Sequence, residues 1–303
     1  MSTVLSDDKS CAPKFDFVST RIATHRCIAK DTWRLTVEAP ELASKTVPGQ
    51  FFMVRIAGRT DPLIGRALAM YDRHLNQDGQ PHAVSVVYTV KGKFTQALSK
   101  CLAGDQVELW GPLGNSFSTE PTDHLILVAG GVGQTPMLTL ASAALGKSSY
   151  GSPSQQNGYA KKVTLCYGAR TKEYLAGVPD FEKACSEVRI ATDDGSQGHH
   201  GRVTDLLRTL LDAEKSMRES GHISNSSLLV RIACCGPEPM MEAVSKIALE
   251  YSVPCELSLE TPMACGIGIC FTCVAKIKQA DGEWDYQRTC IEGPVFEAER
   301  IVW

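Results

Sequence analysis

Residues 124–146, HLILVAGGVGQTPMLTLASAALG, decide the fold of this chain. The stretch opens as a buried strand, runs into a glycine turn and continues with helical periodicity. Three more buried-strand patterns follow, KVTLCYGAR, VRIATDDG and LLVRIACCG, and helix-like stretches such as VTDLLRTLLDAEKSM and PMMEAVSKIALEY lie between them. Because strands and helices alternate, residues 119–252 are predicted to form a doubly wound parallel sheet.

The segments on either side of this α/β region have different sequence patterns. Residues 17–118 contain short β-rich runs separated by Gly and Pro turns, which predicts an antiparallel β-barrel with one helix that starts at Thr95. Residues 253–303 are rich in cysteine and too few to be stabilised by apolar burial alone. We therefore expect a barrel domain, a sheet domain and a small C-terminal domain that holds a metal centre.

Three polar stretches are predicted to lie outside this framework. Residues 1–16 are expected to form a disordered tail. Residues 148–162 and 216–227 read as surface insertions of the sheet domain.

Composition excludes several classes of function. The 303 residues are 43% hydrophobic and 21% charged, with a formal net charge of −3 and no basic cluster, so a nucleic-acid partner is not expected. The polar N-terminus carries no signal peptide, and no apolar run is long enough to span a membrane. Twelve cysteines without an export signal favour reduced thiols and a cytoplasmic location.

The C-terminal cysteines are the strongest chemical signal. Cys265, Cys270 and Cys273 have C-x4-C-x2-C spacing, and Cys290 follows after a gap of sixteen residues. This is the plant-type spacing for a [2Fe–2S] cluster. Gly266 and Gly268 would let the backbone wrap closely around the cluster. Four buried free thiols and a structural zinc site are the alternatives, although zinc usually takes two C-x2-C pairs or a mixture of Cys and His.

The glycine turn after the first sheet strand predicts a dinucleotide site. Gly130, Gly131 and Gly133 would let a diphosphate approach a helix N-terminus, with Thr135 as the cap and Pro136 at the first helical position. A glycine turn before a helix also occurs for structural reasons alone.

Two barrel segments point to a second diphosphate site. Arg66 lies in LIGRALAMYD, just after a strand, and Gly92-Lys93-Phe94-Thr95 opens the predicted barrel helix. Taken separately, the first segment could be an ordinary surface arginine and the second an ordinary helix N-cap. The order of the two segments and their separation in the sequence are what favour a diphosphate site.

In these segments the chain resembles the ferredoxin-reductase superfamily. That family carries an Arg-x-(aromatic or aliphatic)-Ser motif on a barrel strand, and the corresponding stretch here is Arg66-Ala67-Leu68-Ala69. The resemblance implies that Arg66 and the turn at residues 92–95 bind the FAD pyrophosphate, and that Leu68 packs on the flavin. Ala69 departs from the motif, because the family usually places a hydroxyl there, facing flavin N5.

The resemblance extends to the sheet domain. Cys235-Gly236-Pro237 matches the place where the family has a Cys-Gly beside the nicotinamide ring, so Cys235 is the candidate residue for that position. Asp193 and Asp194 stand where NADP-using relatives carry Ser and Arg. Two carboxylates would repel a 2′-phosphate and could accept hydrogen bonds from ribose hydroxyls, which favours NAD over NADP.

The order of the modules narrows the resemblance to one subgroup. Residues 264–268 (ACGIG) and 292–296 (EGPVF) resemble the electron-transfer subunit of class 1B dihydroorotate dehydrogenase, which acts in pyrimidine biosynthesis. The resemblance implies a partner subunit that oxidises dihydroorotate on FMN, in a complex with two copies of each chain. Electrons would pass through the cluster to FAD and on to NAD. The residues around the cysteines, with Phe296 and Trp303, are candidates for the docking face.

Three other functions remain open at this point. The small subunit of an NADH-dependent ferredoxin:NADP oxidoreductase shares the same modules, and so does an oxygenase reductase, although in a different order. A non-enzymatic regulator that senses redox state through its cluster belongs to another class, and Ala69 is the feature in its favour.

Overall fold

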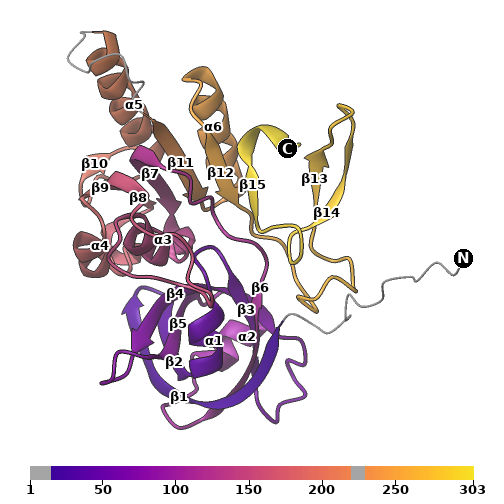
Figure 1. Cartoon of the computed structure of the whole chain (residues 1–303). Helices are drawn as coiled ribbons and strands as arrows, with labels where there is room; N and C mark the ends of the chain where they lie inside the picture. The colour runs from indigo at the N-terminus through magenta and orange to yellow at the C-terminus, as the bar shows by residue number, and fades with distance from the viewer. Residues whose placement is uncertain (1–14, 220–228) are drawn as a thin grey trace, which may run out of the picture.

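The computed structural model describes residues 15–219 and 229–303 and contains the expected barrel, parallel sheet and C-terminal segment. In Figure 1 the indigo barrel lies below the sheet with its helices, and the yellow C-terminal segment lies beside both. The predicted fold class is confirmed. Residues 1–14, most of the predicted tail, lie outside the described residues, and Asp16 already belongs to the first strand.

The barrel is a closed antiparallel sheet with the strand order β1-β2-β5-β4-β3-β6. Its alternating patterns place Leu35, Val54 and Leu109 inside, where they are almost completely buried. The strands are β1 (Asp16–Ala29), β2 (Thr32–Glu38), β3 (Phe51–Ile56), β4 (Arg66–Leu75), β5 (Pro81–Thr89) and β6 (Gln106–Leu113).

The barrel region contains two short helices where the sequence predicted one. Helix α1 (Pro40–Lys45) was missed because six residues are too few to show a helical period. Helix α2 (Lys93–Leu98) begins two residues before the predicted start at Thr95. The Thr95 hydroxyl accepts hydrogen bonds from the N–H groups of Lys91 and Gly92, so Thr95 lies within the first turn and Gly92 is the N-cap.

The second sheet has the order β10-β9-β8-β7-β11-β12-β15, and only β15 runs antiparallel to its neighbour. The four predicted buried strands are β7, β8, β9 and β11. The C-terminal segment contributes β12 and β15 to this same sheet. The bounds are β7 (Thr122–Gly130), β8 (Ala160–Ala169), β9 (Glu187–Thr192), β10 (His199–His200), β11 (Val230–Cys235), β12 (Cys255–Ser258) and β15 (Val295–Glu297).

Helices cover both faces of this sheet. On β7, Leu125 and Leu127 pack in the core that contains α3 (Met137–Ala144) and α4 (Val178–Ala184) and continues into the barrel. Ile126 and Val128 face the opposite core, with α5 (Val203–Glu219) and α6 (Glu238–Glu250). The remaining strands, β13 (Val274–Lys278) and β14 (Trp284–Arg288), form a separate hairpin, and η1 (Gly131–Gln134), η2 (Lys172–Tyr174) and η3 (Ala298–Arg300) are 3-10 turns.

The predicted insertions differ from what is observed. Residues 148–159 do connect α3 to β8, but Tyr150 and Tyr159 are buried in the core, and β8 already begins at Ala160. The second insertion was placed at 216–227, yet α5 continues to Glu219, and residues 220–228 lie outside the described part of the chain.

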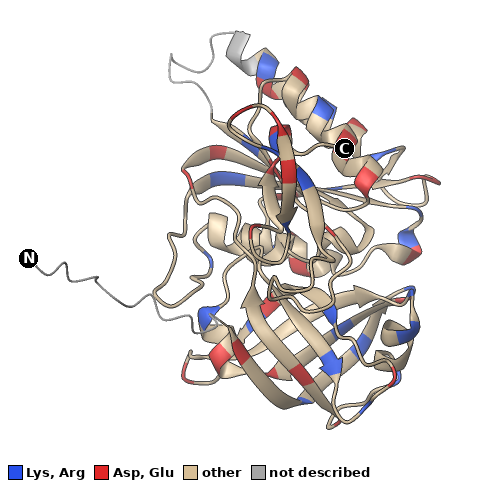
Figure 2. Ribbon diagram, turned by 90° about the vertical axis from the view of Figure 1, so that its right-hand side faces the viewer, with Lys and Arg blue, Asp and Glu red and all other residues tan. Residues whose placement is uncertain are grey.

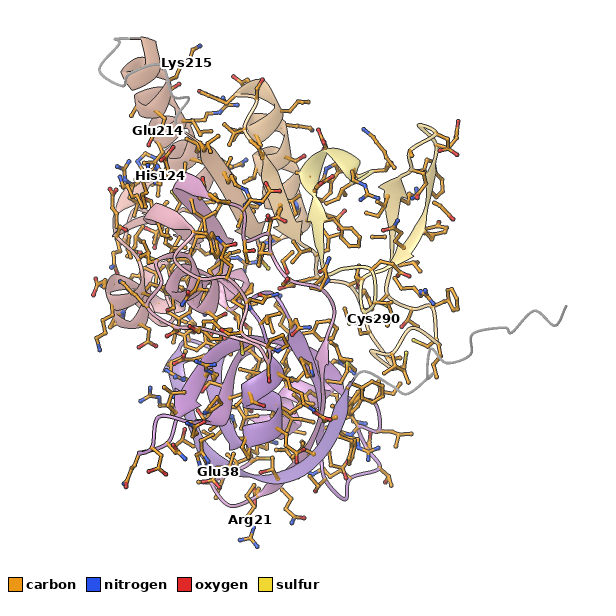
Figure 3. The ribbon with its side chains drawn as sticks, viewed as in Figure 1. Arg21, Glu38, His124, Glu214, Lys215 and Cys290 are labelled. Carbon is orange, nitrogen blue, oxygen red and sulfur yellow. The ribbon has the colours of Figure 1, made fainter. Side chains whose placement is uncertain are left out.

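A buried polar pair joins α5 to the sheet. The His124 ring on β7 contacts Glu214 Oε1 at 2.7 Å and Thr164 Oγ1 at 2.8 Å (Figure 3). Burial lowers the pKa of His124, and the hydrogen bond that its ring donates to Glu214 opposes this effect. Elsewhere Lys and Arg are interspersed with Asp and Glu over both the barrel and the sheet (Figure 2). None of the helices in residues 15–219 and 229–303 is long and apolar enough to cross a bilayer.

Charged side chains tie the barrel to the sheet domain. Arg34 on β2, with a side chain only 9% exposed, forms ion pairs with Asp72 on β4 and with Asp180 on α4, at 3.1 and 3.2 Å. The Tyr71 hydroxyl donates a 2.7 Å hydrogen bond to Asp180. A Cβ at Gly177, which precedes α4, would lie 2.3 Å from the same hydroxyl. Asp180 thus fixes α4 against the barrel.

We predict that Asp180→Asn and Tyr71→Phe each lower the free energy of unfolding by about 1 kcal/mol, because each removes a partly buried polar contact across the junction. Urea denaturation measures the change. The double variant should lose less than the sum, because both changes break the same contact. Glu173→Gln is the control: it breaks the solvent-exposed Lys30–Glu173 pair across the same junction and should change stability very little. Equal losses in all three single variants would contradict this assignment.

Candidate functional site

One cavity of about 470 Å³ lies where the barrel, the parallel sheet and the C-terminal segment meet. Its walls include most of the barrel residues predicted to bind a cofactor, together with two from the sheet domain. The predicted residues that line it are Arg66, Ala67, Leu68, Ala69, Gly92, Phe94, Thr95, Thr135 and Cys235. Segments far apart in the sequence thus share one cavity.

Arg66 is held at the mouth of the barrel wall. It is the first residue of β4, and its Nη1 donates hydrogen bonds to the carbonyls of Ile64 and Gly65 at 3.2 and 3.0 Å. The guanidinium lies over the Phe94 ring, 5.9 Å from its centroid. Lys93, by contrast, does not line the cavity; its Nζ is 2.5 Å from Asp61 Oδ2. The turn therefore offers the cavity the Phe94 ring and the Thr95 side chain, and the Lys93 ammonium is paired elsewhere.

Leu68 and Ala69 lie next to each other on β4 but contact different cores. Leu68 is buried in the barrel core and also lines the cavity. Ala69 packs beside a smaller apolar cluster that contains Met53, Cys273 and Cys290. The strand predicted to carry the flavin thus lies directly against the cysteine segment.

The glycines after β7 let two strand ends approach each other. A Cβ at Gly133 would lie 2.3 Å from the Cys235 carbonyl oxygen, and one at Gly130 would lie 2.6 Å from Met240 Sδ. Gly131 has a φ of +54° and open space around it. Gly130 and Gly133 are therefore required for packing, and only Gly131 leaves room for a ligand beside its Cα.

The predicted cap of α3 is wrong. The helix begins at Met137 with Pro136 as the N-cap residue, and no side chain caps it. Thr135 instead donates its hydroxyl to the Val132 carbonyl at 2.6 Å, because η1 occupies the residues just before it. Thr135 still reaches the cavity.

Cys235 ends β11 at the cavity wall. Its side chain faces the core on the cavity side, whereas Cys234 faces the opposite core, as strand alternation requires. Burial raises the pKa of the Cys235 thiol, which keeps it neutral. A Cβ at Gly236 would lie 2.6 Å from Met240 Cε, and Pro237 is the N-cap of α6.

Asp193 and Asp194 lie on an exposed turn after β9 and are not among the residues that line the cavity. Asp194 Oδ1 accepts hydrogen bonds from the Ser196 hydroxyl at 2.6 Å and its N–H at 3.0 Å. These bonds lower the pKa of Asp194. His199 and His200 form β10 and are exposed.

The four C-terminal cysteines lie in two pairs. Cys273 and Cys290 are buried, and their sulfurs are 3.2 Å apart. The Cys270 sulfur lies 3.1 Å from the Thr272 hydroxyl oxygen. The hydroxyl and N–H of Thr272, followed by Cys265, lower the pKa of Cys270 to about 6. Burial, with the nearby Cys273, raises the pKa of Cys290 to about 12. In Figure 3 Cys290 lies on the C-terminal loops next to the barrel.

Two glycines shape the cysteine loop. Gly266 and Gly268 have φ values of +73° and +80°, which side chains rarely adopt. A Cβ at Gly266 would lie 2.6 Å from Met53, and one at Gly268 would lie 2.7 Å from Ile291. The Gly268 backbone N–H lowers the pKa of Cys290 and so opposes the effect of burial. Glycine is thus needed both for the turn and for its close contact with neighbours.

Four cysteine thiols of the C-terminal segment, two of them with sulfurs 3.2 Å apart, supply the donor set that a [2Fe–2S] cluster takes. Structural zinc needs four ligands around one ion, whereas two irons bridged by sulfide take one pair of thiolates each. The cavity likewise fits a flavin dinucleotide, because Arg66 and Lys91 supply positive charge to an otherwise mainly apolar lining.

Sequence reasoning missed part of the cavity wall. Lys91 and Tyr88 contribute from the barrel, and Pro294 contributes from the C-terminal segment. Ser258 at the end of β12 lines the cavity as well, and so do four residues that follow the strand: Leu259, Glu260, Thr261 and Met263. The sequence signal that could have found them is the short pattern CELS, which forms β12. Because β12 pairs with β11, the residues after it lie at the same sheet edge as Cys235.

Comparisons with known proteins agree with this geometry. Three family models match in order: the oxidoreductase FAD-binding domain over residues 19–117, the oxidoreductase NAD-binding domain over 127–246, and the iron–sulfur cluster binding domain of dihydroorotate dehydrogenase B over 260–302. Among solved structures, the NADH-dependent reduced ferredoxin-NADP oxidoreductase aligns with a TM-score of 0.72 at 27% identity and covers 94% of this chain and 90% of its own. Phthalate dioxygenase reductase, at 17% identity and a TM-score of 0.56, shares the fold; it covers 91% of this chain and 94% of its own.

Curated relatives match over nearly the whole length. The electron transfer subunit of dihydroorotate dehydrogenase B (NAD(+)) from Desulforamulus reducens is 34% identical over 91% of this chain and 94% of its own. The subunit of the same name from Geobacillus kaustophilus is 34% identical over 93% of this chain and 96% of its own length. With its barrel, sheet and paired cysteines in the same order, the chain belongs to the family of electron transfer subunits of dihydroorotate dehydrogenase B.

Proposed function

We propose that this chain transfers electrons between NAD and a separate FMN-containing dihydroorotate dehydrogenase subunit, by way of FAD and a [2Fe–2S] cluster. One observation carries the proposal. Ala67 and Ala69 on the wall of the flavin-sized cavity pack in the same apolar cluster as Cys273 and Cys290. Cys235, predicted to lie beside the nicotinamide, lines that cavity from the sheet domain. A nicotinamide site, a flavin site and a cluster site would therefore adjoin one another.

The protein's part in this chemistry is binding, orientation and exclusion of water. Bound FAD accepts two electrons together and releases them one at a time, which links a hydride carrier to a one-electron cluster. Arg66 and the first turn of α2 would hold the diphosphate, since the first N–H groups of a helix have no intrahelical acceptor. Leu68 would pack on the flavin ring. Gly131, with open space beside its Cα, would admit the nicotinamide dinucleotide at the end of β7.

The cysteine pairs are proposed as the cluster ligands: Cys265 with Cys270 on one iron, and Cys273 with Cys290 on the other. The purified chain should then contain about two irons and two sulfides, and Cys290→Ser should lose most of both, because one iron would be left with a single thiolate. Metal and sulfide analysis after anaerobic purification measures this. Cys27→Ser, at an exposed cysteine on β1, is the control and should keep the full content. Zinc in the parent chain, or unchanged iron in Cys290→Ser, would overturn the ligand assignment.

Asp193 and Asp194 are proposed to select NAD over NADP. They follow β9 at the edge of the sheet where β7 and β11 also end, so a dinucleotide lying across that edge would bring its ribose near them. NADH should therefore reduce the flavin much faster than NADPH. Asp194→Arg should narrow that gap by about tenfold, equivalent to roughly 1.4 kcal/mol, as repulsion of the 2′-phosphate becomes attraction.

Stopped-flow reduction with each dinucleotide tests this preference. Asp281→Arg is a matched control, because Asp281 also accepts a backbone hydrogen bond in an exposed turn, but it lies between β13 and β14. It should leave the ratio unchanged. A parent chain that already prefers NADPH would refute the role of the two aspartates.

The docking face is proposed to lie around the cysteine loop. Ile269 and Phe271 are 73% and 64% exposed, and Ile291 beside Gly268 is also exposed. Of the two aromatic residues suggested by the sequence, Phe296 is only 5% exposed because β15 pairs with β12 and buries it. Trp303 is 39% exposed. Exposed apolar side chains next to a cluster would suit a partner that exchanges electrons with it.

Mixing the chain with a dihydroorotate dehydrogenase catalytic subunit should give a complex with two copies of each and NAD-dependent dihydroorotate oxidation that neither shows alone. Phe271→Asp should weaken the complex at least tenfold, because a charge would be buried in the interface. Size-exclusion chromatography with light scattering measures the assembly. Leu249→Asp, at an equally exposed leucine on α6, should not affect it. Failure of the unmodified chains to associate would refute the partner.

The similarity to the NADH-dependent ferredoxin-NADP oxidoreductase supports a second candidate, a subunit of that kind of complex. The mixing experiment separates the two, since only the first candidate confers dihydroorotate oxidation. For either one we propose a cytoplasmic location, in keeping with the eleven free thiols among the described residues.

A further inference from the structure

A pair of threonine hydroxyls connects the cavity to the cysteine segment. Thr261 lines the cavity from the residues that follow β12. Its Oγ1 lies 2.5 Å from Oγ1 of Thr289, which is completely buried. The Thr289 hydroxyl in turn lies 3.1 Å from the Cys273 carbonyl oxygen. Two hydrogen bonds thus lead from the cavity wall to a proposed cluster ligand.

The direction of these two hydrogen bonds follows from the number of protons. A carbonyl oxygen can only accept, so Thr289 donates its single hydroxyl proton to Cys273. The Thr289 oxygen must then accept its other bond from Thr261, which uses the Thr261 proton. The Thr261 oxygen keeps a lone pair, with which it can accept a hydrogen bond from a molecule in the cavity that it lines.

Stability of the fold does not account for this pair. The Cys273 carbonyl already accepts a 2.8 Å hydrogen bond from the Thr289 N–H, so it does not need the hydroxyl as well. Replacing two bonded polar groups with apolar groups of the same shape is often nearly neutral, and two valines would therefore fill the same space. The hydroxyls call for a functional explanation.

The position of Thr289 relates it to both buried cysteines. It directly precedes Cys290 in the sequence and is hydrogen-bonded to Cys273, and the sulfurs of these two cysteines lie 3.2 Å apart. From the Cys273 carbonyl, only the covalent bonds of that residue lead to its sulfur. A continuous chain of hydrogen-bonded and covalent atoms therefore runs from Thr261 on the cavity wall to a thiol proposed to bind iron.

The proposed function moves electrons across this region. Each step oxidises the flavin by one electron and reduces the cluster by one electron. Two steps return a fully reduced flavin to its oxidised form, and the proton that arrived with the hydride leaves to water. The rate of each step depends on electronic overlap across the intervening atoms. This overlap is greater through hydrogen-bonded and covalent atoms than across a non-bonded gap of the same length.

Apolar contacts offer a competing route. Ala69 lines the cavity and packs beside the cluster of side chains that contains Cys273 and Cys290. That route crosses a van der Waals contact, because an alanine side chain can form no hydrogen bond. The threonine route replaces this contact with two hydrogen bonds.

We propose that Thr261 and Thr289 form the bridge through which electrons pass between the flavin and the cluster. The inference rests on the proposed function and names the route inside it. The hydroxyl protons stay on their oxygens while an electron passes, so the bridge serves both directions of electron flow. Neither threonine belongs to the flavin motif or to the cysteine spacing.

The test uses the full chain loaded with FAD and its cluster under anaerobic conditions. The variants are Thr261→Val, Thr289→Val, the two changes together, and Thr289→Ser, which keeps the hydroxyl. Thr36→Val is a matched control: the Thr36 hydroxyl lies 2.7 Å from that of the buried Ser85, but neither residue lines the cavity.

Three quantities are measured in each protein. Flavin, iron and sulfide contents show whether both cofactors are bound. Spectroelectrochemistry gives the midpoint potentials of the flavin and of the cluster. After rapid mixing with NADH, stopped-flow absorption follows the flavin, and rapid-freeze electron paramagnetic resonance follows the arrival of the electron at the cluster.

Thr289→Val should slow electron transfer from flavin to cluster about tenfold, as is typical when a polar partner of a metal ligand is removed. Cofactor contents and both midpoint potentials should stay at the parent values. Thr261→Val should slow the transfer to a similar extent, and the double variant no further, because both changes break one bridge. Thr289→Ser should restore the parent rate, and Thr36→Val should leave it unchanged.

A parent rate in a fully loaded Thr289→Val protein would overturn the inference while the proposed function stands. A slower rate that follows from a shifted midpoint potential would also overturn it, because the threonines would then tune a cofactor instead of connecting two. If Thr289→Val fails to fold or loses its cluster, Thr261→Val decides by the same criteria, since its hydroxyl bonds Thr289 and not a cysteine. If NADH fails to reduce the flavin even in the parent, the proposed function fails, and the inference fails with it.

Discussion

The close packing of the cysteine loop against the barrel is the contact on which the rest of the structure depends. Gly266 lies so close to Met53 and Leu113 that a Cβ would be 2.6 and 2.8 Å from their side chains. The Trp110 indole N–H donates to the Cys265 carbonyl at 2.9 Å, which anchors the loop to β6. Ala67 and Ala69 lie on β4, which pairs with β3, and pack in the same cluster as Met53, so a shift of the loop would separate the cysteines from the flavin cavity.

The sheet domain meets this assembly through a second close approach. Gly133 lies against the Cys235 carbonyl, which aligns the ends of β7 and β11 at the cavity. Asp180 bonds Tyr71 and Arg34 of the barrel and so fixes the position of α4. An enzyme that only binds a dinucleotide needs no such rigidity. A chain that accepts two electrons and passes them on singly needs three adjacent sites in a fixed arrangement, because electron transfer weakens steeply with distance.

The sequence predicted the parts that depend on local pattern. The apolar run of β7 followed by glycines indicated the sheet, and the spacing of four cysteines indicated the cluster segment. Helix α1 was too short to show a period, and Thr135 was taken for a cap because η1 could not be foreseen. The main feature that the sequence did not predict was the tertiary pairing of the C-terminal strands. The pairing of β12 with β11 and β15 brings Glu260 into the cavity and buries Phe296, and neither outcome is visible without that pairing.

The central claim is that the flavin cavity and the cysteine loop work as one electron path inside this chain. An anaerobic titration with NADH, followed by visible absorption for the flavin and by electron paramagnetic resonance for the cluster, tests it most directly. The structure predicts that the flavin is bleached and that the signal of a reduced [2Fe–2S] cluster appears within the same turnover, without any partner subunit. A flavin that is fully reduced while the cluster stays oxidised, even though its potential permits reduction, would contradict the account.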